Sequence, residues 1–204
     1  MKLYVAERSG NAHKVRLFLS ILGLEYEAVD ADYGTLQSPE FRAKNPRGQI
    51  PTLEVDDRYI WDSQAILVYL ARRYGGEDWL PTDPDGMAEV MQWLALSENE
   101  LLLGIAQARI GTRYPAGNED LILVPLDRAK RYAARGLRVM EERLAARDWL
   151  ALDRPTIAEM ACFTYTALTH EAGIDITPYG AVTRWLDRVR SLPGFVAMPG
   201  MEAA

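Results

Sequence analysis

The chain has 204 residues, 49% of them hydrophobic and 25% charged, proportions typical of a globular protein with a real core. Its net charge of −6 gives it no general electrostatic reason to bind nucleic acid or an anionic membrane. The single cysteine, Cys162, excludes an internal disulfide, and no apolar run approaches the ~20 residues that span a bilayer. Because the N-terminus also lacks the apolar run of a signal peptide, we expect a cytoplasmic protein.

The first 80 residues alternate short strand and helix signals. We expect strands at 2–6 and 26–31, separated by a helix that Asn11 caps and that Gly23 ends in a left-handed conformation. Ser38 and Pro39 open a short helix, and a hairpin at 52–55 and 59–61 leads into a helix at 63–74. A helix between the first two strands predicts parallel pairing, and the hairpin adds antiparallel pairing. The expected structure is a mixed sheet with helices packed on it.

The second part of the chain shows only helical patterns. Residues 80–86 contain two prolines and a glycine, a composition typical of a linker. Helices are expected near 87–110, 122–146, 156–172 and 179–191, and Thr156 and Glu159 have the spacing of a capping box. We therefore predict an α/β domain at 1–79, a linker at 80–86 and an all-helical domain at 87–204.

The most specific motif is Asn45-Pro46-Arg47-Gly48-Gln49-Ile50-Pro51-Thr52-Leu53, followed at hairpin distance by Trp61-Asp62-Ser63-Gln64-Ala65-Ile66. It resembles the glutathione-binding signature of glutathione transferases, and the resemblance extends over nearly the whole chain. It implies a thioredoxin-like first domain, a helical second domain and a cis bond between Ile50 and Pro51.

The resemblance also assigns roles to single residues. The segment Gln49-Ile50-Pro51 would pair its backbone with the cysteinyl part of glutathione, Asp62 would orient the ligand's ammonium group, and Ser63 would hold the γ-glutamyl carboxylate. The general properties of helices support these roles, because a helix that begins near Asp62 offers free N–H groups and a favourable dipole to a carboxylate. The alternative is that Asp62 and Ser63 only cap the helix, but their spacing from Ile50 and Pro51 favours the ligand site.

Glutathione chemistry needs a thiolate, and a free thiol with a pKa of about 8.5 is only slightly ionised at neutral pH. In the family that the chain resembles, the loop after the first strand supplies a group that stabilises the thiolate. Ser9 stands at the matching position, and Asn11 competes with it, as in bacterial nu-like relatives. Both residues could instead make only turn and cap hydrogen bonds. No cysteine lies in this loop, which argues against a mixed disulfide with the protein.

Other polar residues are given structural interpretations. Cys162 lies on an apolar helix and is expected to be a buried thiol, and the two histidines have no spacing that suggests a metal site. We expect Glu98 on a solvated helix face. Three residues could line a pocket for the second substrate or lie on the surface: Arg109, Arg113 and Tyr114.

The sequence thus predicts an enzyme that activates glutathione for attack on a small hydrophobic electrophile. Glutathione would be a co-substrate, and no other cofactor and no metal are expected. One alternative is glutathione-dependent reduction of a hydroperoxide or a disulfide, and another is a non-catalytic protein of the same fold that binds ligands or partners. The resemblance also implies a homodimer, which is consistent with apolar residues on more than one face of the helices at 63–74 and from 87 onward.

Overall fold

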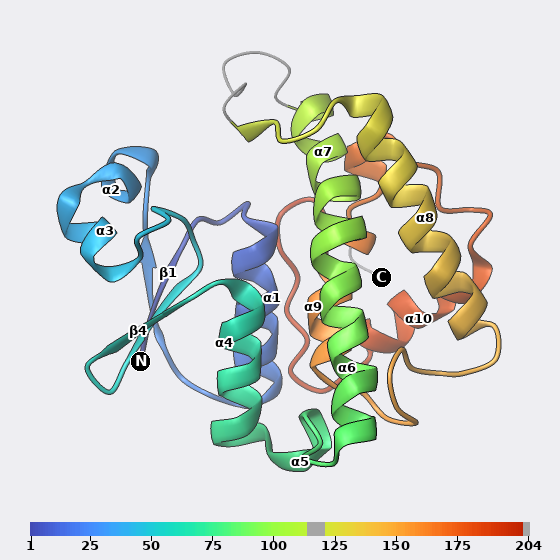
Figure 1. The fold of residues 1–204 in the computed structure, drawn as a ribbon, viewed down its shortest axis with the longest axis horizontal. Coiled ribbons are helices and arrows are strands. Elements are labelled where there is room, and N and C mark those ends of the chain that lie inside the picture. The colour runs from blue at the N-terminus through green and yellow to red at the C-terminus, as the bar shows by residue number, and fades with distance from the viewer. Residues whose placement is uncertain (114–120, 202–204) are drawn as a thin grey trace.

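A computed structural model describes residues 1–113 and 121–201 of the chain. Its N-terminal part is a four-stranded sheet in the order β2-β1-β3-β4, beside a larger group of helices (Figure 1). The strands β1 and β2 are parallel, and the other neighbouring pairs are antiparallel. The expected mixed sheet is therefore confirmed. The strands are Lys2–Val5 (β1), Glu27–Asp30 (β2), Thr52–Val55 (β3) and Arg58–Trp61 (β4).

Local signals in the sequence explain most elements around the sheet. Helix α1 (Gly10–Ile21) crosses from β1 to β2 and is followed by Gly23 at φ 65°, the left-handed conformation expected there. Ser38 caps helix α3 (Pro39–Lys44), as predicted, whereas helix α2 (Tyr33–Gln37) had no clear signal in the sequence. Helix α4 (Ser63–Leu70) follows the hairpin directly. Helix α1 therefore connects β1 to β2, and helices α2 and α3 connect β2 to β3. Helices α1 and α4 pack together.

The linker is shorter than expected. Helix α6 begins at Pro84, three residues before the predicted start, with the Asp83 side chain accepting from the backbone N–H of Gly86 at 2.8 Å. The physical reason is that proline fits the first turn of a helix, where its missing N–H is not needed. The chain reaches α6 (Pro84–Leu96) from α4 through a π-helical segment, Ala71–Gly75, and helix α5 (Gly76–Trp79).

The predicted helix at 87–110 is continuous but not uniform. Its middle, Ser97–Ala106, is π-helical, and the helix regains α-helical geometry in α7 (Gln107–Arg113). The expected helices further on are shorter than predicted. They are α8 (Leu126–Leu144), α9 (Ile157–Thr166) with a following 3₁₀ turn, His170–Ala172, and α10 (Gly180–Arg190).

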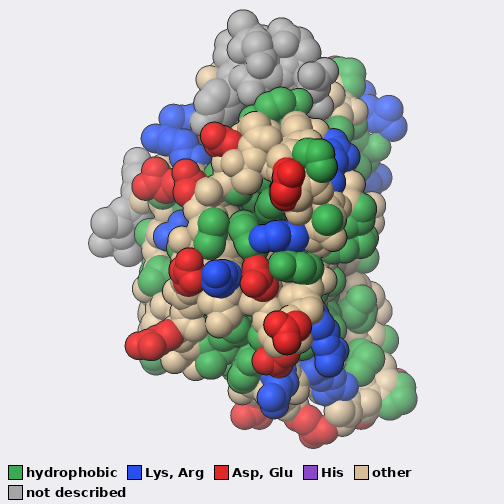
Figure 2. All heavy atoms as spheres, turned by 90° about the vertical axis from the view of Figure 1, so that its left-hand side faces the viewer, with side chains coloured by type: hydrophobic (Ala, Val, Ile, Leu, Met, Phe, Trp, Pro, Cys, Tyr) green, Lys and Arg blue, Asp and Glu red, His purple; other side chains and the backbone are tan. Residues whose placement is uncertain are grey.

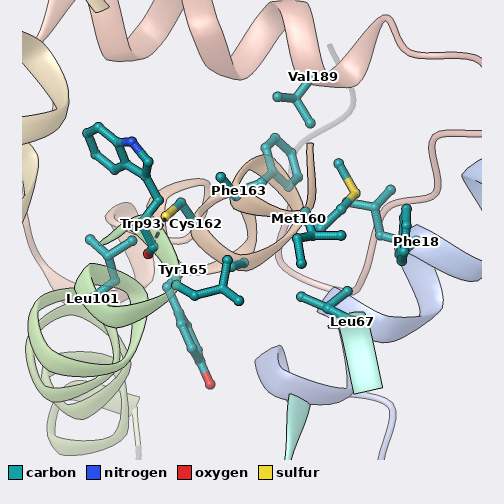
Figure 3. Close-up of a cluster of buried hydrophobic side chains, with 14 of the residues drawn as sticks. Phe18, Leu67, Trp93, Leu101, Met160, Cys162, Phe163, Tyr165 and Val189 are labelled. Carbon is teal, nitrogen blue, oxygen red and sulfur yellow. Dashed lines mark hydrogen bonds between the residues drawn. The ribbon is translucent and has the colours of Figure 1, made fainter. Parts of the chain in front are cut away.

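Helix α9 is the centre of the helical domain and joins it to the sheet domain. All ten of its residues are buried, and it packs against α1, α4, α6 and α10. In Figure 3 its side chains point in several directions, Phe163 toward Val189 and Met160 toward Phe18 and Leu67. A helix that is apolar on every side is buried on every side. One hydrophobic core therefore runs through both domains.

The predicted capping box begins α9. The backbone N–H of Thr156 donates to Glu159 Oε2 at 2.7 Å, and that of Ala158 donates to Thr156 Oγ1 at 3.1 Å. Glu159 also accepts from the N–H of Leu150 at 2.8 Å, so its carboxyl ties the loop before α9 to the helix. Burial raises the pKa of Glu159 above its ordinary value.

His13 fastens the C-terminal segment to the first domain. The ring is fully buried, with Nδ1 2.9 Å from Thr164 Oγ1 and Nε2 2.9 Å from the carbonyl oxygen of Val196. Burial lowers the pKa of His13 from 6.5 to about 4. The folded protein therefore resists protonation of a ring that the unfolded chain would protonate readily.

We expect this histidine to make stability depend on pH. The unfolded state binds more protons below pH 6.5, so the free energy of unfolding should fall as the pH drops, by about 2 kcal/mol between pH 7 and pH 5. Urea unfolding of the parent and of His13→Gln at both pH values measures this. The variant, which has no imidazole to titrate, should lose less on acidification. An equal loss in both proteins would show that His13 is not responsible.

The surface at the sheet end of the molecule mixes charges of both signs with hydrophobic side chains (Figure 2). The net negative charge is therefore not gathered into one acidic area on this face. Within residues 1–113 and 121–201, no helix has the length and apolar character needed to cross a membrane.

Candidate glutathione site

A cavity of about 610 Å³ lies where the sheet domain meets the helical domain. All seven residues proposed from the sequence line this one cavity: Ser9, Asn11, Gln49, Ile50, Pro51, Asp62 and Ser63. The opposite wall comes from the helical domain and includes Glu98, Leu102, Ala106, Arg109, Ile110 and Tyr165. The folding of the chain thus brings together residues that are far apart in the sequence.

Asn45 organises the loop that leads to Pro51. Its Nδ2 donates to the carbonyl oxygen of Gln49 at 2.7 Å and to Thr52 Oγ1 at 3.0 Å, and its Oδ1 accepts from the N–H of Arg47 at 3.0 Å. The side chain is almost completely buried, at 1% exposure. The Ile50–Pro51 peptide is cis, as predicted.

Asp62 and Ser63 lie at the start of α4. Asp62 has φ 76° and ψ 127°, which lies outside the left-handed helical region and is a strained conformation for a residue other than glycine. Its Oδ1 accepts from the N–H of Gln64 at 2.9 Å, and its Oδ2 is 3.2 Å from Arg47 Nη1. Ser63 is the first residue of the helix and faces the cavity. Asp62 therefore caps the helix, and a cap does not prevent either residue from contacting a ligand.

Ser9, and not Asn11, is the cap of α1. Ser9 Oγ accepts from the N–H of Ala12 at 3.2 Å, while Asn11 lies inside the first turn of the helix. The helix begins at Gly10, where an added Cβ atom would lie 2.4 Å from Tyr165 Cε1. Asn11 Oδ1 is buried and has no hydrogen-bond partner in the described part of the chain. Both candidates nevertheless face the cavity.

Glu98 does not lie on a solvated helix face, so that expectation was wrong. Lys14 from α1 is completely buried, and its Nζ lies 3.2 Å from Glu98 Oε1 and 3.1 Å from Ser97 Oγ. Gln64 Nε2 donates to the same oxygen of Glu98 at 2.6 Å. A buried cation needs a partner of opposite charge, which explains why Glu98 is held inward at the cavity wall.

Four residues of the helical domain were missed or left undecided by the sequence. Arg109 is buried and lines the cavity, whereas Arg113 lies outside the cavity lining and its side chain is 37% exposed. Tyr165, which the sequence did not single out, stands against Gly10. Burial raises the pKa of Tyr165, so its hydroxyl stays protonated and can only donate or accept as a neutral group. Tyr114 lies outside the described residues.

The remaining candidates have structural positions. Cys162 is fully buried beside Trp93 (Figure 3), with Sγ 3.5 Å from the Trp93 carbonyl oxygen, and burial raises the pKa of its thiol. A buried thiol that stays protonated is a poor nucleophile. The described ranges, 1–113 and 121–201, hold no group of three or more His, Cys, Asp or Glu side chains that could bind a metal ion.

Comparison with protein families agrees with this geometry. Residues 3–78 match the family model for the N-terminal domain of glutathione S-transferases, and residues 125–193 match the model for the C-terminal domain. A glutathione S-transferase 1 from Schizosaccharomyces pombe is 33% identical over 76% of this chain and 69% of its own length. The chain belongs to the glutathione transferase family.

Other relatives show how far this assignment reaches. A crystal structure from Rhodopseudomonas palustris, described as a possible glutathione S-transferase, superposes with a TM-score of 0.88 at 37% identity and covers 97% of both chains. The disulfide-bond oxidoreductase YfcG of Escherichia coli is 28% identical over 90% of this chain and 87% of its own length. Members of the family bind glutathione but differ in the reaction that follows. Family membership therefore does not specify which reaction this chain catalyses.

Proposed function

We propose that this protein is a glutathione transferase that binds glutathione between Pro51, Ser63 and Ser9 and transfers it to an electrophile. The observation that carries the proposal is that all seven candidate residues line the same cavity. The Ile50 backbone would pair with the cysteinyl part of glutathione. Asp62 and Ser63 would hold the γ-glutamyl end, where the N-terminus of α4 favours a carboxylate.

Ser9 suits the role of thiolate donor. Its Oγ already accepts from the N–H of Ala12, and a hydroxyl can accept one hydrogen bond while donating its own proton to another group. The cap therefore leaves the hydroxyl proton of Ser9 free to form a hydrogen bond with the glutathione sulfur. The positive end of the α1 dipole would also stabilise the thiolate. Asn11, in the first turn of the helix, offers an amide as the alternative or additional donor.

The reaction would then be a nucleophilic substitution or addition. The thiol proton is lost to solvent, and the thiolate sulfur forms a bond to the electrophilic carbon. In a substitution, a leaving group departs with the electrons of the bond that breaks. In an addition, the electrons of the broken π bond take up a proton from solvent. The apolar side chains Leu102, Ala106 and Ile110 would contact the body of the electrophile. The enzyme's part is to hold the thiolate and bring both reactants together.

A parallel assay tests the proposed reaction. Purified protein with glutathione is offered an aryl halide, an organic hydroperoxide and a small disulfide. Conjugation of the aryl halide above the uncatalysed rate supports the transferase. Tight glutathione binding without turnover of any of the three would favour a non-catalytic binding protein and would refute the proposal.

Reduction of disulfides with glutathione is the second candidate. The similarity to the E. coli disulfide-bond oxidoreductase favours it. Because Cys162 is buried, exchange would proceed through the thiol of bound glutathione and not through a cysteine of the protein. Reduction of hydroperoxides at the same thiolate is possible on the same chemical grounds, and the parallel assay separates the three activities.

We predict that Ser9→Ala raises the pKa of the bound glutathione thiol by about one unit, because one hydrogen bond to a charged group is worth about 1.5 kcal/mol. Turnover at neutral pH should fall more than glutathione affinity. The thiolate absorbance of the complex, titrated against pH, measures the change directly. Ser9→Thr keeps a hydroxyl and should restore the titration of the parent. An unchanged titration in Ser9→Ala would move the assignment to Asn11.

We also propose a two-fold homodimer, the arrangement that family resemblance suggests. Large apolar side chains stay exposed on β4, after α4 and on α6: Trp61 is 38% exposed, Tyr74 39% and Met91 46%. A symmetric interface would bury such residues on both copies. Light scattering at micromolar protein should give about twice the 22.9 kDa of one chain. A mass that stays at one chain as concentration rises would contradict the dimer.

A further inference from the structure

The charged side chains around the cavity differ in how many partners of opposite charge each one has. At the end assigned to glutathione, Asp62 pairs with Arg47 at 3.2 Å, and Glu98 pairs with Lys14 at 3.2 Å. Each carboxylate there has its own cation. Arg109, also on the wall formed by the helical domain, shares its carboxylate partner with Arg113.

Arg109 and Arg113 share one carboxylate. Arg109 Nε pairs with Glu171 Oε2, and Arg113 Nη1 pairs with Glu171 Oε1. Among the described residues, this cluster holds two guanidinium groups and one carboxylate. Arg8, which is exposed, lines the same cavity. Two arginines, Arg8 and Arg109, therefore face this part of the cavity, although the whole chain carries a net charge of −6.

The hydrogen bonds of Arg109 are incomplete. Its side chain is only 7% exposed, and Nη1 donates to the carbonyl oxygen of Arg8 at 3.2 Å. Nη2 is buried and finds no acceptor among residues 1–113 and 121–201. A buried guanidinium N–H without an acceptor costs free energy, because its lost hydration is not replaced. An anionic acceptor beside Arg109 would remove that cost.

The neighbours of Arg109 define the rest of such a ligand. Ala106 and Ile110 lie within one helical turn of Arg109 and line the same wall, together with Leu102. A ligand that fills this part of the cavity would place an apolar body against these side chains and an anionic group near the guanidinium. A planar carboxylate matches the planar fork of arginine, and their attraction is stronger in a partly enclosed cavity than at the surface.

We propose that the electrophile taken by this cavity carries a carboxylate, and that Arg109 selects it. This inference rests on the proposed function, since it assumes that glutathione occupies the other end of the cavity. Arg109 would act on specificity and not on the thiolate. Its effect should therefore depend on the second substrate and leave the affinity for glutathione itself unchanged.

The test uses two ligands that differ by one carboxylate: S-benzylglutathione and S-(4-carboxybenzyl)glutathione. Calorimetry gives their affinities, and that of glutathione, for the parent, Arg109→Met and Arg131→Met. Arg131 is a matched control, because its side chain is 70% exposed on α8 and lies outside the cavity lining. The parent should bind the carboxylated ligand about tenfold more tightly, a preference that Arg109→Met abolishes and Arg131→Met keeps.

A second variant should act in the opposite direction. Glu171→Gln removes the carboxylate that partly compensates Arg109 and should increase the preference several-fold. This variant and the parent still decide the question if Arg109→Met does not fold by circular dichroism. Equal binding of the two ligands by the parent, or a preference that survives in folded Arg109→Met, would overturn the inference. Weaker binding of glutathione to Arg109→Met would also overturn it, since Arg109 would then hold a carboxylate of glutathione.

Activity separates this inference from the function on which it rests. The same proteins are assayed with 2-chloro-1,3-dinitrobenzene and with its carboxylated counterpart, 4-chloro-3,5-dinitrobenzoate. Turnover of both without preference refutes the role of Arg109 and leaves the transferase intact. A binding preference without turnover of either refutes the transferase and leaves the carboxylate site.

Discussion

Gly104→Ala should destabilise the protein by at least about 3 kcal/mol, the upper part of the range for an added methyl group in a packed core. A Cβ at Gly104 would lie 2.4 Å from the backbone nitrogen and 2.7 Å from the Cα atom of Ala133. Both atoms belong to the backbone of α8, so no side chain can rotate away. The helix itself would have to move, although alanine is intrinsically the better helix former.

Gly111→Ala is the matched control for this prediction. Gly111 lies in α7, and among the described residues the nearest atom to its added Cβ would be Leu126 Cδ1 at 3.8 Å, an ordinary contact. This substitution should be neutral or stabilise by up to about 1 kcal/mol. Urea unfolding of the two variants measures both effects. Equal stability of Gly104→Ala and the parent would mean that α8 and the π-helical segment do not cross as closely as described.

The close contact between Gly104 and α8 also affects the shape of the candidate site. The segment Ser97–Ala106 carries Glu98, Leu102 and Ala106 to the cavity wall, and Gly104 sets how closely this segment approaches α8. A folded Gly104→Ala variant should therefore also change the shape of the pocket for the second substrate. The glutathione end, built on α1 and α4, should be affected less.

Patterns that act over a few residues were readable in the sequence. Thr156 and Glu159 form the predicted capping box, and Ser38 caps the helix that Pro39 begins. Strands of the hairpin were placed within one residue, because alternation and turn residues are local signals. The π-helical geometry at 97–106 was not readable, since an apolar pattern on several faces suits either kind of helix.

Pairings over long distances in the sequence were not predictable. Lys14 looks like a surface residue of an amphipathic helix, and only the fold brings it to Glu98, 84 residues away. Arg109 meets Glu171 across 62 residues, so its burial had no local signal. The tight contact between Gly10 and the Tyr165 ring also joins residues far apart in the sequence and had no local signal. The motif predicted residues that line one cavity, but it did not predict the ion pairs around them.

Ser63→Ala should weaken glutathione binding about tenfold to a hundredfold. We propose that the Ser63 hydroxyl and the first N–H groups of α4 hold the γ-glutamyl carboxylate, and a hydrogen bond to a charged group is worth about 1.5–3 kcal/mol. Asp62→Ala should cost a similar amount. That variant alone is ambiguous, because it also removes the cap of α4 and places alanine at φ 76°.

Asp62→Asn separates these effects. Asparagine caps a helix as well as aspartate does and has nearly the same size and shape, so the start of α4 should keep its geometry. It lacks the negative charge that pairs with Arg47 and that would attract the ammonium group of the ligand. If the negative charge of Asp62 contributes to glutathione binding, Asp62→Asn should bind glutathione at least several-fold more weakly. Its free energy of unfolding should stay close to that of the parent. Calorimetric affinities within twofold of the parent for Ser63→Ala and Asp62→Asn together would show that the start of α4 is not the glutathione site.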